Sequence, residues 1–593
     1  MIRAPLRPLA RILRARENGE NPARIEREAR LKRAAQVQDR ARARAETRLT
    51  VMGLLFVFAF ASIGYRMATL AGSAPEEPRA SVSNNPIIGL RADILDRNGN
   101  ILATNLETNS VYAQPPQMID PVGTARKLAA IFPELNADQL IRDFTGSRKF
   151  VWIRRQISPE QMQQVHDIGD PGILFGPREM RIYPNGPVAS HILGGATYGR
   201  EGVNAAEIVG VAGVARQFDS FLRDPANNGA PLKLSIDLSV QAATEQVLAG
   251  GMSLMNAKGA AAVLMDVHTG EILALASLPD FDPNNRPRPL TTGDASDSPL
   301  FNRAVQGVYE LGSTFKVFAV AQALQLGLIT PDTMIDTRGP LVWGKFRIND
   351  FHDYGSHLSV TDVIVESSNI GAARIAQQIG TDRQRAFLGS LGLLDATPVE
   401  LAEAPGGRPL VPPHWSELST MTIAYGHGIA DSPLHLAAAY ASILNGGTLV
   451  RPTLLKQDHP QAGPRIVSEA VSEQMRQMLR AVVTRGTASF GDVPGYQVAG
   501  KTGTADKPDP QGGYYNDKVV ATFASAFPAN DPRYVLVVTL DEPSETTGGA
   551  PKRTAGWTAV PVAAEMIRRV GPLLGLRPQI ETPDAAGIQL SSN

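Results

Sequence analysis

A single uncharged stretch, residues 49–65, limits the architecture of this chain more than any other feature of its sequence. It reads LTVMGLLFVFAFASIGY and lies between Arg48 and Arg66. A length of about 17 apolar residues is near the minimum for a helix that crosses a bilayer. We therefore expect a transmembrane anchor over residues 49–70, with separate parts of the chain on its two sides.

A basic arm precedes this stretch. Residues 1–48 hold 14 Arg or Lys against 6 acidic residues, whereas the remaining chain holds 44 basic and 52 acidic residues. Because positive flanks stay inside, the arm is expected in the cytoplasm and everything after Arg66 outside it. A cleaved signal peptide, favoured by the small residues 71–74, and a buried globular helix are alternatives, but a 48-residue basic region is long for a signal peptide. An arm of this charge also permits nucleic-acid binding, which its position beside a membrane anchor disfavours.

The rest of the chain is long enough for more than one domain. Its 593 residues, 43% hydrophobic and without cysteine, fit folded globular material and exclude disulfides and thiolate chemistry. Small, polar and Pro-containing residues at 71–87 predict a linker. We expect a first folded module over 88–225, a larger one over 226–575 and a tail at 576–593.

Hairpin and helix patterns indicate the fold class. Residues 91–103 predict two short strands around an Asn-Gly turn, and residues 260–277 predict a second hairpin. Helical patterns fill residues 360–445, strand patterns cover 519–526 and 534–541, and residues 560–570 predict a closing helix. Strands at both ends with helices between them favour an α+β domain with one antiparallel sheet flanked by helices.

Candidate catalytic residues begin with Ser313 and Lys316, ahead of the apolar run 317–324, which predicts a buried helix. Residues three apart on a helix share a face, so the hydroxyl and the amine can meet. A serine needs a base to become a good nucleophile, and burial would lower the pKa of the lysine toward that role. The alternative is a serine cap beside a lysine that reaches solvent.

Two further motifs follow downstream. Ser367 and Asn369 can relay a proton and hold a peptide carbonyl, although a helix cap explains such a pair equally well. Residues 501–505, Lys-Thr-Gly-Thr-Ala, occupy a strand-like setting. There Gly503 would let an extended peptide approach the strand, with a glycine bulge as the alternative.

The order S-x-x-K, S-x-N, K-T-G in an α+β frame resembles the penicillin-binding, active-site-serine family. Within that family the chain is similar to class B penicillin-binding proteins, and most to the division-specific peptidoglycan D,D-transpeptidases. The stretches that carry this resemblance include residues 91–103, 181–184, 309–316, 367–369, 445–447, 501–505 and 541–543.

The resemblance implies a role for each motif residue. Ser313 would be the acylated nucleophile and Lys316 its base, while Ser367 and Asn369 would assist proton transfer and hold substrate. Lys501 would tune the local charge.

Substrate binding is implied for the strand motif. Thr502 and Thr504 would bind the terminal carboxylate of a stem peptide, with Gly503 leaving room for it. An oxyanion hole would use the backbone N–H groups of Ser313 and Thr504.

The implied reaction is transfer of a peptidyl group from a D-Ala-D-Ala donor to an amine of a neighbouring stem peptide, with β-lactams as covalent inhibitors. No cofactor is expected, and with nine scattered histidines, His268 among them, no metal site. A membrane-spanning glycosyltransferase and other division proteins are expected partners. The first module is expected to position the second.

Two departures from the family pattern stand out. Leu311 occupies a position where the family usually has Pro, and Ala215 replaces an expected Glu, which leaves the ion pair of that Glu in doubt. Two alternative functions remain: an elongation-type transpeptidase, and a β-lactam-sensing receptor, for which the 48-residue arm leaves no room for an effector domain.

Overall fold

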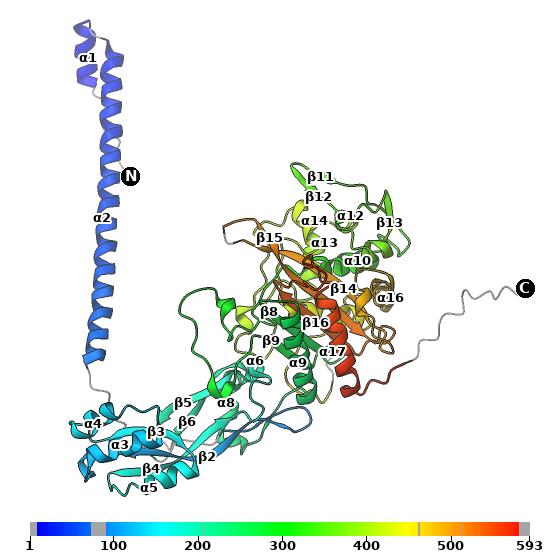
Figure 1. The fold of residues 1–593 in the computed structure, drawn as a ribbon. Helices are drawn as coiled ribbons and strands as arrows, with labels where there is room; N and C mark the ends of the chain where they lie inside the picture. Colours follow the sequence, from blue (N-terminus) through cyan, green and yellow to red (C-terminus); the bar gives the residue numbers. More distant parts are fainter. Residues whose placement is uncertain are drawn as a thin grey trace, which may run out of the picture. The chain divides into compact units, whose positions relative to one another are not determined.

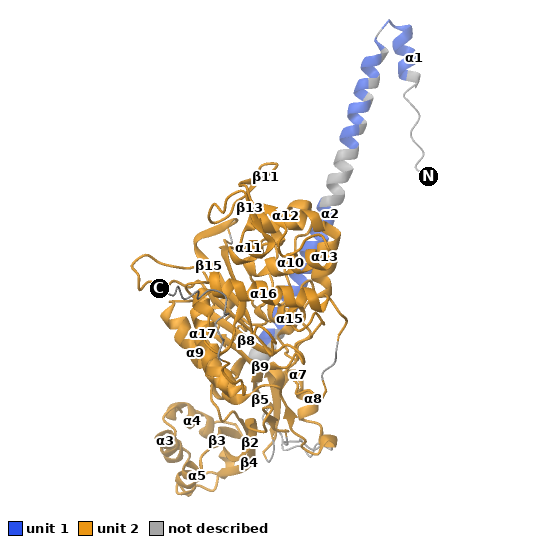
Figure 2. Ribbon diagram, turned by 90° about the vertical axis from the view of Figure 1, so that its right-hand side faces the viewer, with its two compact units in different colours: residues 1–79 blue, residues 80–593 orange. Residues whose placement is uncertain are grey.

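The computed structural model describes residues 9–19, 21–72, 91–203, 206–459, 463–509 and 511–579. The chain divides into two compact units, residues 1–79 and 80–593 (Figures 1 and 2). The predicted linker 71–87 lies outside the described residues apart from its first two positions, as does most of the predicted tail 576–593.

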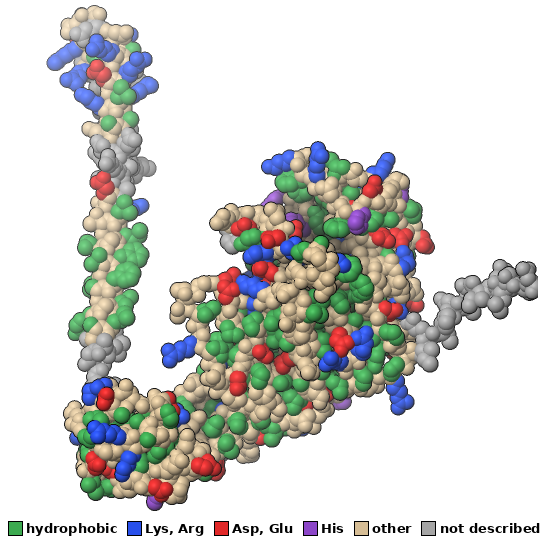
Figure 3. Space-filling model, viewed as in Figure 1, with side chains coloured by type: hydrophobic (Ala, Val, Ile, Leu, Met, Phe, Trp, Pro, Cys, Tyr) green, Lys and Arg blue, Asp and Glu red, His purple; other side chains and the backbone are tan. Residues whose placement is uncertain are grey.

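The first unit is helical. α1 (Leu9–Glu17) precedes the long helix α2 (Pro22–Gly72). Within the described residues, the section Glu46–Tyr65 of α2 is the one long helical segment apolar enough to cross a membrane. Hydrophobic side chains surround this section, whereas Lys and Arg gather at the other end of α2 (Figure 3). The predicted apolar helix is therefore present.

The second unit begins with a sheet built on one long strand, β2 (Ile101–Ala113). Its start pairs antiparallel with β1 (Ile94–Leu95) across the predicted Asn-Gly turn, where Gly99 has φ of +90°. Further along, it pairs with β3 (Val151–Ile157) and β4 (Ile173–Ile182). The hairpin prediction is confirmed, but β2 is longer than the short strand expected.

Smaller elements complete this part of the chain. They are α3 (Pro121–Ile131), α4 (Ala137–Thr145), α5 (Pro159–His166), α6 (Ser190–Leu193), β5 (Gly195–Glu201), β6 (Ala206–Ala212), α7 (Gly213–Gln217), α8 (Asp219–Leu222) and β7 (Leu232–Lys233). The far end of β2 packs with α3 and α4 in a core of its own, which includes Val111 and Leu128. In contrast, Ile94 and Leu102 share one continuous core with the larger module.

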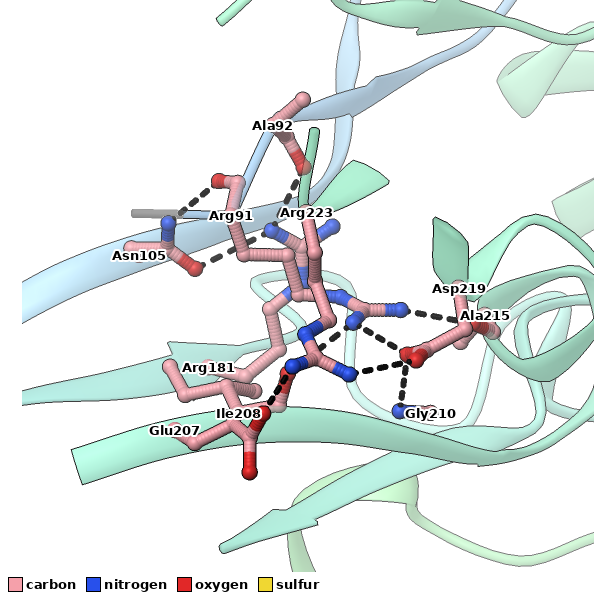
Figure 4. Close-up of polar contacts among 10 residues, drawn as sticks. All are labelled: Arg91, Ala92, Asn105, Arg181, Glu207, Ile208, Gly210, Ala215, Asp219 and Arg223. Atoms are coloured by element: carbon pink, nitrogen blue, oxygen red, sulfur yellow. Dashed lines mark hydrogen bonds and ion pairs between the residues drawn. The ribbon is translucent and has the colours of Figure 1, made fainter. Parts of the chain in front are cut away.

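The position of Ala215 shows how the chain manages without the expected Glu (Figure 4). The guanidinium of Arg91 is buried and donates to the backbone carbonyl of Ala215 at 2.6 Å. Its other terminal nitrogen donates to Asp219 at 2.6 Å, and Asp219 also pairs with Arg223 at 3.0 Å. The buried arginine therefore takes its carboxylate from Asp219, four residues further along.

The larger module contains an antiparallel five-stranded sheet. Its strands are β8 (Gly259–Asp266), β9 (Ile272–Leu278), β14 (Ala499–Pro508), β15 (Tyr514–Phe527) and β16 (Tyr534–Asp541), in the order β14-β15-β16-β8-β9. This order brings the two ends of the module together and leaves β14 at an edge. The predicted antiparallel sheet is confirmed.

Helices cover both faces of this sheet (Figures 1 and 2). α9 (Leu238–Leu254) packs against α17 (Ala559–Leu573) on one side, and α15 (Pro433–Leu444) contacts β8 and β16 on the other. The remaining helices are α10 (Lys316–Gln325), α11 (Val360–Val365), α12 (Asn369–Ile379), α13 (Thr381–Ser390), α14 (Glu417–Ile423) and α16 (Glu469–Arg485), with short strands β10 (Met334–Asp336), β11 (Leu341–Trp343), β12 (Phe346–Ile348) and β13 (His357–Ser359).

Every residue of α10 from Lys316 to Leu324 is buried, so the predicted buried helix is confirmed.

Candidate active site

Ser313 lies in a short 3₁₀ helix, η5 (Gly312–Phe315), directly before α10. In a 3₁₀ helix, side chains three residues apart eclipse each other, which brings them closer than on an α-helix. The Lys316 Nζ accordingly lies 2.6 Å from the Ser313 Oγ. The pairing was predicted, but on an α-helical turn. Leu311, at the Pro position, is buried, and its carbonyl accepts a hydrogen bond from the Thr314 hydroxyl.

The second motif reaches the same amine. Lys316 Nζ donates to Asn369 Oδ1 at 2.7 Å and to Ser367 Oγ at 3.3 Å. Ser367 has φ of +65°, a conformation that costs energy for a residue with a side chain and is found mainly where the surrounding structure enforces it. Asn369 begins α12. The structure therefore brings both residues to the Ser313–Lys316 pair.

The third motif closes the cluster from the edge strand β14. Lys501 Nζ donates to Ser367 Oγ at 2.9 Å. Thr502 and Thr504 line a cavity of about 570 Å³ together with Ser313 and Asn369. Residues from positions 313, 367 and 501, far apart in sequence, thus share one site. All eight residues that the sequence singled out lie at or beside it.

Burial sets the electrostatics of the two lysines. Both have a relative exposure of 0%. Burial, and next the charge of Lys501, hold the pKa of Lys316 well below its ordinary value, and burial lowers the pKa of Lys501 to about 7. An amine so placed can exist without its proton and accept one from a neighbouring hydroxyl.

Gly503 has a packing role that the sequence did not predict. A Cβ at this position would lie 2.1 Å from the carbonyl oxygen of Leu311 and 2.9 Å from Thr314. The side of β14 toward which a side chain at position 503 would point is therefore filled by the residues around the 3₁₀ helix. The glycine lets β14 and the serine-bearing segment pack in direct contact.

Sequence reasoning missed Asp350, which supports the second motif. Its carboxylate accepts hydrogen bonds from the backbone N–H of Asn369 at 2.5 Å and of Ile370 at 3.0 Å, and from the Ser368 hydroxyl at 2.6 Å. It thereby holds the first turn of α12. A single Asp in a loop forms no recognisable sequence pattern. The only signal for this supporting role of Asp350 was its position shortly before the S-x-N motif.

Within the described ranges no group of three or more potential metal ligands comes together. A hydroxyl beside an amine without access to water, with an amide and a second amine around them, defines a serine acyl-transfer site.

Comparisons with known proteins define the class further. Residues 260–563 match the model of the penicillin binding protein transpeptidase domain, and residues 86–227 match the penicillin-binding protein dimerisation domain. The chain belongs to the class B penicillin-binding proteins.

Named relatives and solved structures agree with this family. The chain is 36% identical to the probable peptidoglycan D,D-transpeptidase FtsI of Caulobacter vibrioides, covering 94% of each chain. It is 29% identical to the peptidoglycan D,D-transpeptidase FtsI of Escherichia coli K12, covering 83% of this chain and 85% of that one. The crystal structure of penicillin binding protein 3 from Mycobacterium tuberculosis complexed with aztreonam aligns with a TM-score of 0.62 at 25% identity, over 83% of this chain and 98% of that one.

Proposed function

We propose that this chain is a serine D,D-transpeptidase that crosslinks peptidoglycan stem peptides during septal wall synthesis and is acylated by β-lactams. The observation that carries the proposal is the 2.6 Å approach of the buried Lys316 amine to the Ser313 hydroxyl, with Asn369 on the same amine at 2.7 Å. Relatives named D,D-transpeptidase support the reaction. The motifs that resemble the division-specific group support the septal role.

The first half-reaction forms an acyl-enzyme. Ser313 Oγ attacks the carbonyl carbon of the penultimate D-Ala while its proton passes to the neutral Lys316 amine. Backbone N–H groups of Ser313 and Thr504 would stabilise the tetrahedral oxyanion. Ser367 lies within reach of both lysines. Through its hydroxyl, the proton held by Lys316 then passes to the amine of the departing D-Ala as the C–N bond breaks.

The second half-reaction reverses these roles. An amine of a neighbouring stem peptide attacks the ester, its proton passes to Lys316, and Ser313 recovers a proton as the C–O bond breaks. Thr502 and Thr504 would hold the terminal carboxylate of the donor, beside the positive charge of Lys501. A β-lactam acylates Ser313 by the same first step and remains attached to it as an ester.

The remaining features suit a membrane-anchored enzyme. We propose that residues 1–48 are cytoplasmic, that α2 crosses the inner membrane, and that residues 88–225 position a transpeptidase module of residues 226–575 outside it. A glycosyltransferase that spans the membrane beside α2 is the proposed partner.

The decisive test is labelling with a tagged penicillin, followed by digestion and mass mapping. We expect one modified peptide, containing Ser313, and no labelling in Ser313→Ala, whose thermal unfolding should match the native chain. Labelling that maps elsewhere, or that persists in Ser313→Ala, would contradict the proposal. Acylation without release of D-Ala from any peptide donor would favour the receptor alternative.

A second prediction concerns Asp350 as a positioning residue. Asp350→Ala removes the acceptor at the start of α12, so we expect the acylation rate to fall about tenfold to a hundredfold as Asn369 loses its place. The negative charge of Asp350 raises the pKa of Lys316. Its removal therefore lowers that pKa further, and the acid limb of the pH–rate profile should move to lower pH.

The conservative variant Asp350→Asn separates charge from position. It retains an oxygen that can accept from the Asn369 N–H, so it should recover most of the rate while keeping the displaced pH profile. An unmoved profile in both variants would contradict the electrostatic part of this prediction.

A further inference from the structure

His427 lines the cavity that contains Ser313. Gly426, the residue before it, has φ of +78°, and a Cβ there would lie 2.0 Å from the carbonyl oxygen of Gly312, the residue before Ser313. The backbone segments that carry the imidazole and the nucleophile are therefore in direct contact. The side chain of His427 is 44% exposed, so a molecule in the cavity can reach it.

Glu310 gives this imidazole a carboxylate partner. Nδ1 of His427 lies 3.1 Å from Glu310 Oε2. The other oxygen of Glu310 accepts hydrogen bonds from the Gly428 N–H at 2.8 Å and from the Tyr514 hydroxyl at 3.0 Å, which fix the carboxylate in place. A carboxylate so held orients a histidine and stabilises its protonated form.

The second ring nitrogen of His427 keeps a lone pair. Nε2 lies 3.3 Å from the hydroxyl oxygen of Tyr514. Because that hydroxyl has a single hydrogen and donates it to Glu310, it has none to give to Nε2. A neutral His427 with its proton on Nδ1, toward Glu310, can therefore accept a proton at Nε2.

The charged groups around His427 favour a cation. Its contact with Glu310 is the largest cause that raises the pKa of His427 above its ordinary value, and the charge of Asp506 adds to it. Asp506 lies on the wall between the catalytic cavity and a second cavity of about 440 Å³. The ionisable residues that line this second cavity are Asp294, Glu310, Asp506, Asp541 and Lys507.

Two bases thus lie in one cavity with different neighbours. Lys316 contacts Ser313, whereas His427 faces carboxylates, and the ring of Tyr425 lies 5.9 Å from the Lys316 amine and 6.3 Å from the His427 ring. A second imidazole in the cavity, His352, packs against aromatic rings, and no ion pair joins it to a carboxylate in the described part of the chain. His427 alone of these two imidazoles has the carboxylate of a histidine base.

The second half-reaction needs such a base. An aliphatic amine is an ammonium at neutral pH and has no lone pair with which to attack the ester. It must lose one proton before the attack and another as the new C–N bond forms. Lys316 takes the later proton and returns it to Ser313, so the first proton requires a different acceptor.

We propose that His427 is the general base that takes this first proton from the acceptor ammonium, with Glu310 as its positioning residue. An N–H bond of the ammonium breaks as the N–H bond at Nε2 forms, which leaves a neutral amine and an imidazolium. The amine attacks the ester carbonyl carbon on Ser313, and the imidazolium releases its proton to solvent. This inference rests on the proposed transpeptidase function and adds the residue that activates its acceptor.

The test compares two acceptors on one acyl-enzyme. The full chain in detergent micelles is acylated with a thioester donor and offered either D-alanine, mostly an ammonium at neutral pH, or hydroxylamine, which is uncharged there. The readout is the ratio of aminolysis to hydrolysis product for each acceptor. This ratio is set after the acyl-enzyme has formed, so it does not depend on the acylation rate.

His427→Gln retains a polar side chain of similar size but cannot take the proton. At neutral pH we expect its ratio with D-alanine to fall about tenfold to a hundredfold, and its ratio with hydroxylamine to change by less than about twofold. His268→Gln is the matched control, because His268 is exposed and lines neither cavity. It should keep both native ratios.

The pH profile provides a readout that a merely structural role would not move. Transfer to D-alanine by the native chain should rise with pH and level off once His427 is neutral, whereas in His427→Gln it should keep rising toward the pKa of the amine itself. Glu310→Gln removes a negative charge and so lowers the pKa of His427, which should move the native rise to lower pH.

Each result bears on one of the two proposals. Equal losses with both acceptors in His427→Gln, a native ratio with D-alanine in that variant, or a selective loss in His268→Gln would overturn His427 as the base and leave the transpeptidase in place. Failure of the native chain to form an acyl-enzyme on Ser313 with either penicillin or the thioester would overturn the proposed function, and this inference with it.

Discussion

Replacing Lys316 by methionine should lower the rate of penicillin acylation by about a hundredfold to ten-thousandfold, the range that a positioned general base contributes. Methionine fills nearly the same buried volume but cannot take the proton of Ser313, whose Oγ lies 2.6 Å from the lysine amine. Stopped-flow acylation with a chromogenic β-lactam measures the effect. Lys127→Met, an exposed lysine on α3, is the matched control and should acylate at the native rate.

The same role of Lys316 predicts the direction in which the acylation rate changes with pH. Only the uncharged amine accepts a proton, so the native rate should rise with pH as Lys316 deprotonates and fall as acid protonates it. Because burial holds its pKa well below the ordinary lysine value, the rise should be complete far below pH 10. The Lys316→Met variant should lack this acid limb. A native profile that still climbs near pH 10 would mean that the amine is not the base.

A single added methyl group at Gly503 should be nearly as damaging. The Cβ of Gly503→Ala would lie 2.1 Å from the Leu311 carbonyl oxygen, and a backbone atom cannot rotate away. Either β14 or the segment that carries Ser313 must shift. We expect acylation to slow by about a hundredfold, since small misplacements of reacting groups have effects of that size, and the free energy of unfolding to fall by about 1–3 kcal/mol.

Gly250→Ala provides the control for this substitution. Gly250 lies in α9, where an added Cβ would have no other atom within 4 Å, and alanine is the better helix former. We expect native acylation and a gain in stability of about 0.5–1 kcal/mol. Equal activity in Gly503→Ala and Gly250→Ala would show that contact between β14 and the 3₁₀ helix does not position the serine.

Local patterns in the sequence were sufficient for many elements. The buried helix α10, the hairpin β8–β9 and the strands β15 and β16 follow from hydrophobic periodicity and turn residues, which are properties of neighbouring residues. The length of β2 was underestimated, because most of this strand pairs with β4 across a long stretch of intervening chain and so leaves no local pattern.

The site, too, could be predicted only in part from the sequence. The order of the motifs containing Ser313, Ser367 and Lys501 is written in the sequence, and it was enough to predict that they meet. The support that Asp350 gives to α12, and the choice of Asp219 as the partner of Arg91, depend on side chains brought together by folding.

The sequence by itself determined the reacting groups, the family and the apolar segment Leu49–Tyr65, since each depends on residue types at short spacing. Only the tertiary structure showed that Gly503 packs against the backbone of Leu311 and that Ser313 lies in a 3₁₀ turn. It also showed that a second cavity, lined by acidic residues, adjoins the catalytic cavity. These features arise where segments far apart along the chain pack against one another, and close packing between distant segments has no signature in the sequence.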